Sequence, residues 1–253
     1  MEEYMPKSVD STLLERRCIR RYALRAIPED DLAFIRAAVR NTPTSYNAQQ
    51  FSVIEVTDQG LKDELAALIG QTQLKYAAVD FMFLSDFHKM SVAAKARGLP
   101  APEFQNTADG LVVGTIDASL AMMSAIVAAV SRGLGTCPIG YARTVDPEKI
   151  TEILKLPKGV YLVCALAVGV PADMPDLKPK QPEDLVFFKN TYGTEDMAKK
   201  LLAYDETIKA YHKSRTSNQS DEDWIGQMLA YYQEAMKTNF LHFLQGQGYG
   251  LKK

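Results

Sequence analysis

The chain has 253 residues, of which 47% are hydrophobic and 24% are charged. These fractions are typical of a folded, soluble protein, and they argue against a disordered, collagen-like or low-complexity chain. The formal net charge of -2 at pH 7 excludes the strongly cationic field that nucleic-acid-binding proteins usually present.

The first part of the chain predicts helices and then a sheet. Apolar residues at helical spacing predict a helix over residues 9–17. Pro28 opens a second helix, because proline suits the first helical turn and three acidic residues follow it. This helix ends near residues 41–43. The next predicted elements are a strand at 51–56, a helix at 61–69, a strand at 80–84 and a polar, mobile helix or loop at 85–105.

Residues 111–130 are apolar at most of their twenty positions. A membrane span is the alternative reading, but Asp117 lies in the middle third, where a carboxylate is costly in lipid. The segment therefore predicts a helix that is buried on nearly all sides of a soluble core. Gly133 and Gly135 follow it and end the helix.

The second half predicts one central strand and a helical tail. A nearly continuous apolar run at 160–168 is typical of a strand buried on both faces. Four prolines make residues 171–182 an extended loop, and glycines at 246, 248 and 250 predict a flexible end. The helices of this half are predicted at 147–154, 194–213 and 221–243. Together these elements predict an α+β or α/β domain with a C-terminal helical extension.

Two segments carry candidate chemistry. Residues 16–21 hold four arginines, whose forked guanidinium groups match phosphate oxygens. The alternative is a solvated helix end, since cations favour a helix C-terminus. Residues 41–50 are rich in short hydrogen-bonding side chains before a strand, which suits contact with a polar ring edge or a ribityl chain. The alternative here is a turn that caps its own backbone.

The three cysteines are Cys18, Cys137 and Cys164, and none of them forms a CxxC pair. A disulfide framework is therefore not expected, and a reducing compartment such as the cytoplasm fits better. Cys137 and Cys164 lie in apolar runs and are expected to be inert core residues. Residues 1–6 carry no basic region followed by an apolar run, which predicts no secretory signal.

Taken together, these segments resemble the flavin-dependent nitroreductases. The resemblance begins with Arg-Arg-Cys-Ile-Arg-Arg-Tyr at 16–22 and continues with Thr-Pro-Thr-Ser-Tyr-Asn-Ala-Gln-Gln at 42–50. It extends through residues 132–140 and 166–173. Pro-Asp-Leu-Lys-Pro-Lys at 175–180, the loop 214–218 and Trp224 resemble the oxygen-insensitive, NADPH-dependent branch, which includes flavin reductases. The motifs cover almost the whole chain in the family's order.

The resemblance implies a nitroreductase-like α+β fold with a mostly antiparallel central sheet, as a single domain over 1–253 whose extension spans 173–253. It implies a homodimer with two FMN sites at the subunit interface, and neither a nucleic-acid nor a membrane partner. It also implies a two-step, ping-pong cycle. NADPH, with NADH as the other possible donor, passes hydride to FMN, which then reduces a small acceptor such as a nitroaromatic, a quinone or free flavin.

The family's FMN contacts carry over residue by residue. The phosphate and ribityl region of FMN is expected to contact Arg16, Arg17, Cys18 and Arg20, and the ring and ribityl groups are expected to contact Thr44, Ser45 and Asn47. The polar edge of the ring is expected to contact Gln71, and the ring itself is expected to lie against Ile139, Gly140 and Tyr141. The phosphate and the pyrimidine side are expected to lie near Lys178 and Lys180. Arg215 matches the loop that clamps the 2′-phosphate of NADPH. No catalytic acid or base is assigned.

The sequence departs from the family's pattern at three places. Cys18 stands where serine is common, and a thiol donates poorly, so a contact is expected through its backbone. Lys180 stands where arginine is common and predicts a looser contact. Ser220 replaces a second basic residue near Arg215, and three acids follow it, so NADH use stays open.

Two alternatives remain at this stage, of which one is a soluble phosphate-binding module with no flavin. A flavin-binding or flavin-donating protein of the same fold would show little turnover of its own. A metal site is not expected from the histidines, because His88, His212 and His242 are far apart in the sequence and no HExxH motif occurs.

Overall fold

The computed structural model describes residues 7–251, so the segment 1–6 that was read for a secretory signal lies outside it. The chain divides into two compact units. The first comprises Met1–Asp173 and Asn239–Lys253, and the second is Met174–Thr238. The single domain expected over residues 1–253 stays a prediction.

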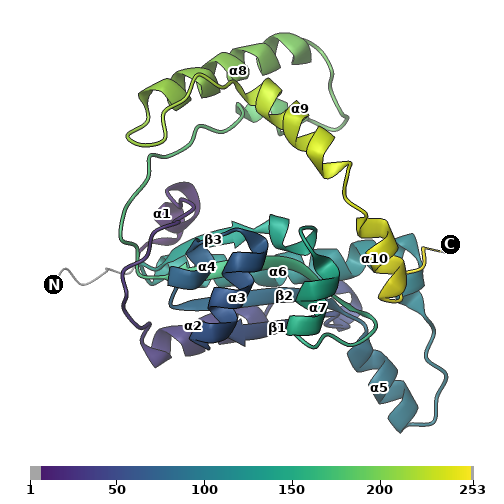
Figure 1. Ribbon diagram of the computed structural model, residues 1–253. Helices are drawn as coiled ribbons and strands as arrows, with labels where there is room; N and C mark the ends of the chain where they lie inside the picture. Colours follow the sequence, from purple (N-terminus) through teal and green to yellow (C-terminus); the bar gives the residue numbers. More distant parts are fainter. Residues whose placement is uncertain (1–6, 252–253) are drawn as a thin grey trace. The chain divides into compact units, whose positions relative to one another are not determined.

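The first unit is built on a sheet of four strands in the order β1-β2-β4-β3 (Figure 1). All three pairings between neighbours are antiparallel, which confirms the predicted antiparallel sheet. The strands are β1 (Phe51–Val56), β2 (Val79–Asp86), β3 (Gly135–Ile139) and β4 (Val160–Gly169). Every residue of β4 is buried, so the prediction of a central strand covered on both faces is confirmed.

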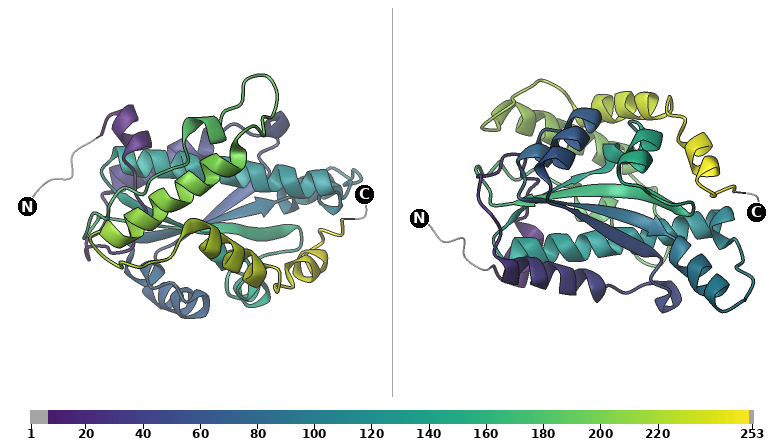
Figure 2. Two further views of the ribbon diagram at one scale, coloured as in Figure 1. Left: turned by 90° about the horizontal axis from the view of Figure 1, so that it is seen from above. Right: turned by 60° about the horizontal axis from the view of Figure 1, so that its bottom comes forward.

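Side chains that alternate along the strands build two cores, one on each face of the sheet. Phe81 and Phe83 of β2 face α2 (Glu29–Arg40) and α6 (Ala108–Ser131), whereas Met82 and Leu84 face α3 (Gln59–Ile69) and α7 (Pro147–Ile153). Figure 2 shows these two pairs of helices on opposite faces of the sheet. The layers are therefore helix, sheet, helix.

The long helix α6 is not buried on nearly all sides, so that prediction was wrong. An apolar stripe of it is open in the single chain: Val112 is 52% exposed, Ile116 50%, Leu120 41% and Met123 38%. These residues form the α6 stripe. The helix is long and apolar enough to span a membrane by length and composition alone, but so are many core helices of soluble proteins. Here its other face packs against α2 and β2.

Several helices differ from the prediction at their ends. α1 covers Val9–Leu14, so it stops before the arginines. The segment expected to be a mobile helix or loop contains the end of β2, then α5 (His88–Ala96) and a 3-10 turn at Phe104–Asn106. α4 (Gln73–Tyr76) is a short turn that was not predicted.

Residues 246–250 are anchored in the first unit, not flexible as predicted. α10 (Phe240–Gly246) leads to Tyr249, which is fully buried. The Tyr249 hydroxyl lies 3.0 Å from Ser85 Oγ and donates to the carbonyl of Gly159 at 2.9 Å. Its ring meets the Tyr161 ring edge-on, with the centroids 4.9 Å apart. Residues 239–251 therefore complete the core that α6 and the sheet begin.

The second unit holds α8 (Met197–Ser214) and α9 (Trp224–Ala235), which pack through the rings of Tyr204 and Trp224 at 5.3 Å. A single helix over 221–243 was predicted, and that is wrong. α9 ends at Ala235, and α10 belongs to the other unit. Residues 171–182 contain no helix, as predicted, and a 3-10 turn follows at Glu183–Leu185.

Candidate functional site

Residues 16–20, the arginine segment, run alongside strand β3. Cys18 forms a parallel bridge with Thr136, and the backbone N–H of Ile19 donates to the carbonyl of Thr136 at 2.9 Å. The buried Ile19 side chain packs against Gly135, where a Cβ atom would come within 2.7 Å of it. Because α1 ends at Leu14, the reading of these arginines as a helix end is wrong.

Tyr22 fixes the other end of this segment. Its buried hydroxyl is 2.8 Å from the carbonyl of Ile19 and 3.1 Å from that of Ala167. Burial raises the pKa of Tyr22 above its ordinary value, so the hydroxyl keeps its proton. The backbone that carries Arg16, Arg17 and Arg20 is therefore held on both sides of Ile19.

Arg17 carries an unused donor. Its Nε atom is buried and has no hydrogen-bond partner among the described residues. A buried guanidinium donor without a partner is costly, and an anionic oxygen is the acceptor that satisfies it best. Arg16 is half-buried beside it, and Arg20 is exposed. This arrangement fits the phosphate of a bound nucleotide or flavin.

Gln71 joins the same region through a second glutamine. Gln73 is 5% exposed, and its Nε2 donates to Gln71 Oε1 at 2.6 Å and lies 3.9 Å from the sulfur of Cys137. Cys137 is on β3, next to the residue that Cys18 pairs with. The structure thus brings Cys18 and Gln71, which were predicted separately, to one end of β3. Gln73 itself was missed, since no spacing in the sequence marks it.

Cys18 lies in an unusual electrostatic setting. A hydrogen bond with the Cys137 thiol lowers the pKa of Cys18 to about 5, against the opposing effect of burial, and the charges of Arg20 and Arg16 lower it further. The same bond and burial raise the pKa of Cys137 well above its ordinary value. Cys137 and Cys164 are both buried, as predicted, but only Cys137 makes this contact.

The loop over residues 41–50 is held by the buried carboxylate of α6. Asp117 is 1% exposed and accepts the backbone N–H of Ser45 at 3.1 Å and of Gln50 at 3.2 Å. Thr42 is tied to Ser124 of α6 at 2.7 Å. Ser45 and Asn47 lie in an exposed 3-10 turn, with Thr44 half-buried before it. In the sequence, Asp117 served only as an argument against a membrane span, and its role as the anchor of this loop was not predicted.

The arginine segment and the loop 41–50 are far apart in one chain. The loop enters the sheet at Phe51, level with Tyr161 of β4, whereas Cys18 lies at the level of Val168. The stretch of β4 between those levels is roughly 20 Å long. Helix α6 leads to the same separation. Asp117, which holds the loop, and Ser131, which lies just before β3, are also roughly 20 Å apart along the helix. The predicted FMN residues of the first unit therefore fall into two sets.

Residues 139–141 follow the end of β3. Ile139 is 4% exposed and belongs to the core, so its side chain packs within its own chain. Gly140 begins a 3-10 turn in which Arg143 Nη1 donates to its carbonyl at 3.0 Å. A Cβ atom at Gly140 would lie 2.9 Å from that guanidinium. The Tyr141 side chain is 55% exposed.

Lys178, Lys180 and Arg215 belong to the second unit. Both lysines are exposed, in the extended segment. Arg215 follows α8, and its Nη2 donates to the carbonyl of Asn218. The carboxylate of Asp176 holds the next residue, Thr216, by its backbone N–H and its hydroxyl. The Arg215 loop is thus tied to the segment that carries the two lysines, within one unit.

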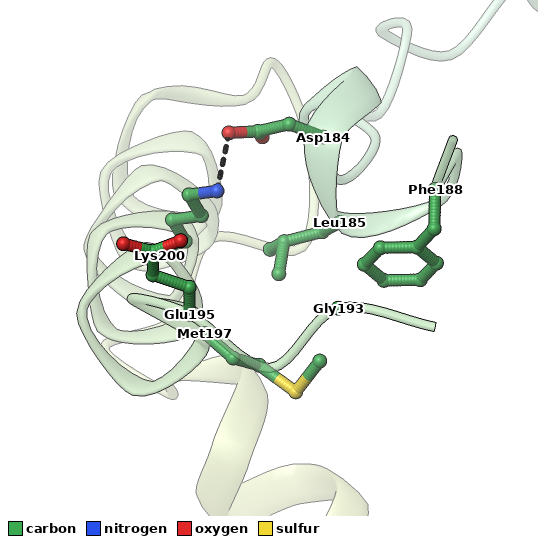
Figure 3. Close-up of a pocket in the computed structure, with 7 residues that line it drawn as sticks. All are labelled: Asp184, Leu185, Phe188, Gly193, Glu195, Met197 and Lys200. Carbon is green, nitrogen blue, oxygen red and sulfur yellow. Dashed lines mark ion pairs between the residues drawn. The ribbon is translucent and has the colours of Figure 1, made fainter. Parts of the chain in front are cut away.

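Two hollows lie away from the predicted residues. A pocket of about 130 Å³ in the second unit is bounded by the Asp184–Lys200 ion pair at 2.8 Å and by Phe188 (Figure 3). It is smaller than a typical small-molecule site. A hollow of about 390 Å³ in the first unit is lined by residues 23–27, Lys62 and Lys75, among others. Neither includes a residue that the family's FMN contacts fall on. Among residues 7–251, no three metal-ligating side chains gather.

Comparison with known proteins gives consistent matches. The model of the "Nitroreductase family" matches residues 13–170, and that of the "Nitroreductase family, C-terminal domain" matches residues 178–252. An "FMN reductase" acting with NAD(P)H from Bacillus subtilis (strain 168) is 33% identical over 247 residues, covering 97% of this chain and 99% of that protein. An oxygen-insensitive NADPH nitroreductase from Salmonella typhimurium is 34% identical over 244 residues, and the match covers 95% of this chain and 97% of that protein.

A solved structure is similar over the same extent. The NfrA1 nitroreductase from B. subtilis matches with a TM-score of 0.91 at 30% identity, and the match covers 96% of this chain and 99% of that one. The predicted fold is therefore confirmed at the level of the whole chain.

Proposed function

Because the chain belongs to the nitroreductase family, we propose that its arginine segment and Gln71 hold FMN. The protein is an oxidoreductase that takes electrons from NADPH or NADH and reduces flavins or nitro compounds with FMN as cofactor. The observation that carries the site is the arginine segment, which is pinned beside β3 with the buried Nε of Arg17 still without an acceptor.

The arginines and Gln71 have different roles in this site. Arg16, Arg17 and Arg20 supply charge-assisted hydrogen bonds to the phosphate, which are shorter and stronger than neutral ones. Gln71, oriented by Gln73, offers its amide to the polar edge of the ring. Bound FMN supplies the ring that accepts and donates hydride, and the protein supplies orientation and electrostatics. Because positioning is the main requirement, no acid or base of the chain is given a catalytic role.

The residues of the second unit keep the roles that the family suggests. Lys178 and Lys180 provide cations for the phosphate and pyrimidine side of FMN, and Arg215 reads the 2′-phosphate of NADPH. In support, Arg215 sits in a loop that Asp176 holds in place. Small aromatic or flavin molecules are the proposed acceptors, and the cytoplasm is the proposed location, since all three cysteines are free thiols.

We further infer that the functional unit is a homodimer. Thr44, Ser45 and Asn47 lie roughly 20 Å from the arginine segment of their own chain along the sheet. A second copy can supply them if the loop 41–50 of one subunit meets the arginine segment of the other. The α6 stripe offers the apolar surface for such a contact, and it lies on the helix that anchors the loop.

The proposed activity is tested by the visible spectrum of the purified protein, followed by addition of NADPH without oxygen. A flavin spectrum that bleaches within the mixing time is expected. A flavin spectrum that persists with both NADPH and NADH would indicate a flavin-binding role without turnover. A colourless protein that takes up no added FMN would overturn the site.

A further inference from the structure

Cys18 and Cys137 meet where the arginine segment joins β3. We propose that these two thiols are a redox-active pair, in which Cys18 reacts with a hydroperoxide and then closes to a disulfide with Cys137. The pair is a modification site distinct from flavin reduction. Only the expected protection by FMN rests on the proposed function.

The fold brings the two cysteines together from opposite parts of the chain. The parallel bridge sets Cys18 opposite Thr136, and Cys137 is the next residue of β3. The Cys18 side chain packs against the same core that contains Cys137, and the pKa of each thiol is shifted by the other. The hydrogen bond of Tyr22 to the Ile19 carbonyl holds the backbone that presents Cys18. Both thiols are free in the structure.

The surroundings give the two thiols different tasks. Cys18 is half-buried and has Arg16 and Arg20 as cationic neighbours, which favour the thiolate, the nucleophilic form. Cys137 is 2% exposed, keeps its proton and faces the Gln73 amide at 3.9 Å. Cys18 is therefore the thiol that a peroxide reaches, and Cys137 is the thiol that resolves the product.

The reaction balances with the peroxide as the oxidant. The Cys18 thiolate attacks one oxygen of the hydroperoxide, the O–O bond breaks, and an alcohol or water leaves after taking up a proton. Cys18 is then a sulfenic acid. The sulfur of Cys137 attacks the sulfur of Cys18 and displaces the hydroxyl group of the sulfenic acid. The S–S bond forms, and the proton of Cys137 leaves with that hydroxyl as water. The two thiols together lose two electrons to the peroxide.

Cys164 is the matched control within the same sheet. It is also buried on a strand, but it belongs to the core on the other face and its thiol donates to the carbonyl of Ala165 at 3.3 Å. Burial raises the pKa of Cys164, and the smaller opposing effects of a backbone hydrogen bond from Ile139 and of the Arg143 charge do not cancel the rise. It should neither react with peroxide nor pair with another cysteine.

The experiment is thiol counting by mass spectrometry after exposure of the flavin-free protein to hydrogen peroxide. Alkylation of the unfolded protein should find three free thiols before exposure and one after it, with a peptide linked through Cys18 and Cys137. Cys164→Ser should still form the link. Cys18→Ser should leave both remaining thiols free. Cys137→Ser should leave a sulfenic acid at Cys18 that a dimedone probe labels.

The outcomes separate this proposal from the FMN site. Linkage in the flavin-free protein supports the thiol pair even if no FMN ever binds. Three free thiols after peroxide, or linkage through Cys164, would overturn it. If FMN binds as proposed, loading should slow the linkage at least about tenfold, because the ligand covers the arginine segment. Linkage at an unchanged rate in FMN-loaded protein would remove Cys18 from the FMN site while leaving the thiol pair intact.

Discussion

Arg20 and Arg21 are neighbours in the sequence, but their surroundings differ. Arg20 adjoins Cys18 in the arginine segment, whereas Arg21 makes an exposed ion pair with Asp173 at 3.7 Å. The sequence showed four similar arginines. The structure separates them, because Arg20 acts on the Cys18 thiol whereas Arg21 pairs with the Asp173 carboxylate.

Arg20→Ala should weaken FMN binding by about 1.5–3 kcal/mol, the usual worth of a hydrogen bond to a charged group. Arg21→Ala, the matched control, should change it little, since exposed ion pairs contribute little. Titration of the flavin-free protein with FMN, followed by fluorescence quenching, measures both. Equal losses in the two variants would show that only the total charge of the segment matters.

Asp80 is a buried acid whose carboxylate oxygens find no hydrogen-bond partner among the described residues. Burial raises the pKa of Asp80 to about 8, with Lys62 opposing the shift. The folded protein therefore keeps a proton that the unfolded chain loses near pH 4. The free energy of unfolding should fall as pH rises from about 4 to about 8, by at most about 1.4 kcal/mol per pH unit.

Asp80→Asn removes this titration, so the slope of stability against pH should flatten across that window. Denaturant unfolding of both proteins at a series of pH values measures the slopes. The comparison uses the slope and not the absolute stability, because the amide also changes the packing. Parallel slopes for the two proteins would show that Asp80 is not the titrating group.

Arg215 is the residue through which donor choice should be read. Arg215→Ala should raise the KM for NADPH far more than the KM for NADH, since only NADPH has the 2′-phosphate that a guanidinium binds. Arg215→Lys keeps the charge, so its KM for NADPH should lie between that of the unchanged protein and that of Arg215→Ala. Steady-state kinetics with each donor measures this, and equal effects on both donors would exclude a role in phosphate recognition.

At the scale of elements, the helices and strands with a local sequence pattern were predicted correctly. The strand at 160–168 and the helices after Pro28 and at 147–154 were close to their observed bounds. β3 was missed because Gly135 and Pro138 are poor strand residues. Pro138 is tolerated because β3 is an edge strand of the described sheet. The break between α9 and α10 depends on which unit each helix packs in, which no local pattern records.

The candidate site followed the same rule. Residues within one motif, such as Arg16 to Arg20, could be found from a resemblance. Asp117, Gln73 and Cys137 act through contacts across the fold, and neither composition nor spacing marks them. The α6 stripe was hidden for a related reason: a helix that is apolar all round does not tell which face meets its own chain.

Leu120→Glu, in the middle of the α6 stripe, should shift the protein from dimer to monomer. A carboxylate buried without a partner at an interface is costly. In a monomer the same side chain is 41% exposed, so the fold itself should tolerate it. Leu24→Glu, at a position 90% exposed and outside the stripe, is the control. Sedimentation velocity measures both, and a Leu120→Glu protein that stays dimeric would place the interface elsewhere.

At the scale of the whole molecule, a site shared by two subunits makes a prediction that no single-chain site makes. Arg20→Ala and Asn47→Ala should each impair FMN binding. In a dimer that joins one subunit of each kind, both defects fall in one site and the other is intact. Equal amounts of the two variants, mixed and allowed to exchange, should recover about a quarter of the sites. Absence of recovery, with exchange shown independently, would place both sets of residues in one subunit's site.

The fold closes with its last described residues. Tyr249 fills the core between Tyr161 and Ser85, and the second unit is inserted before it in the chain. The ribosome therefore synthesises the sheet, the helices over both its faces and the whole second unit before it synthesises Tyr249, which completes the core between α6 and the sheet. During synthesis that core stays open at one end, and the time it takes to make residues 174–249 is a window in which a chaperone, a protease or the flavin itself meets an unfinished protein.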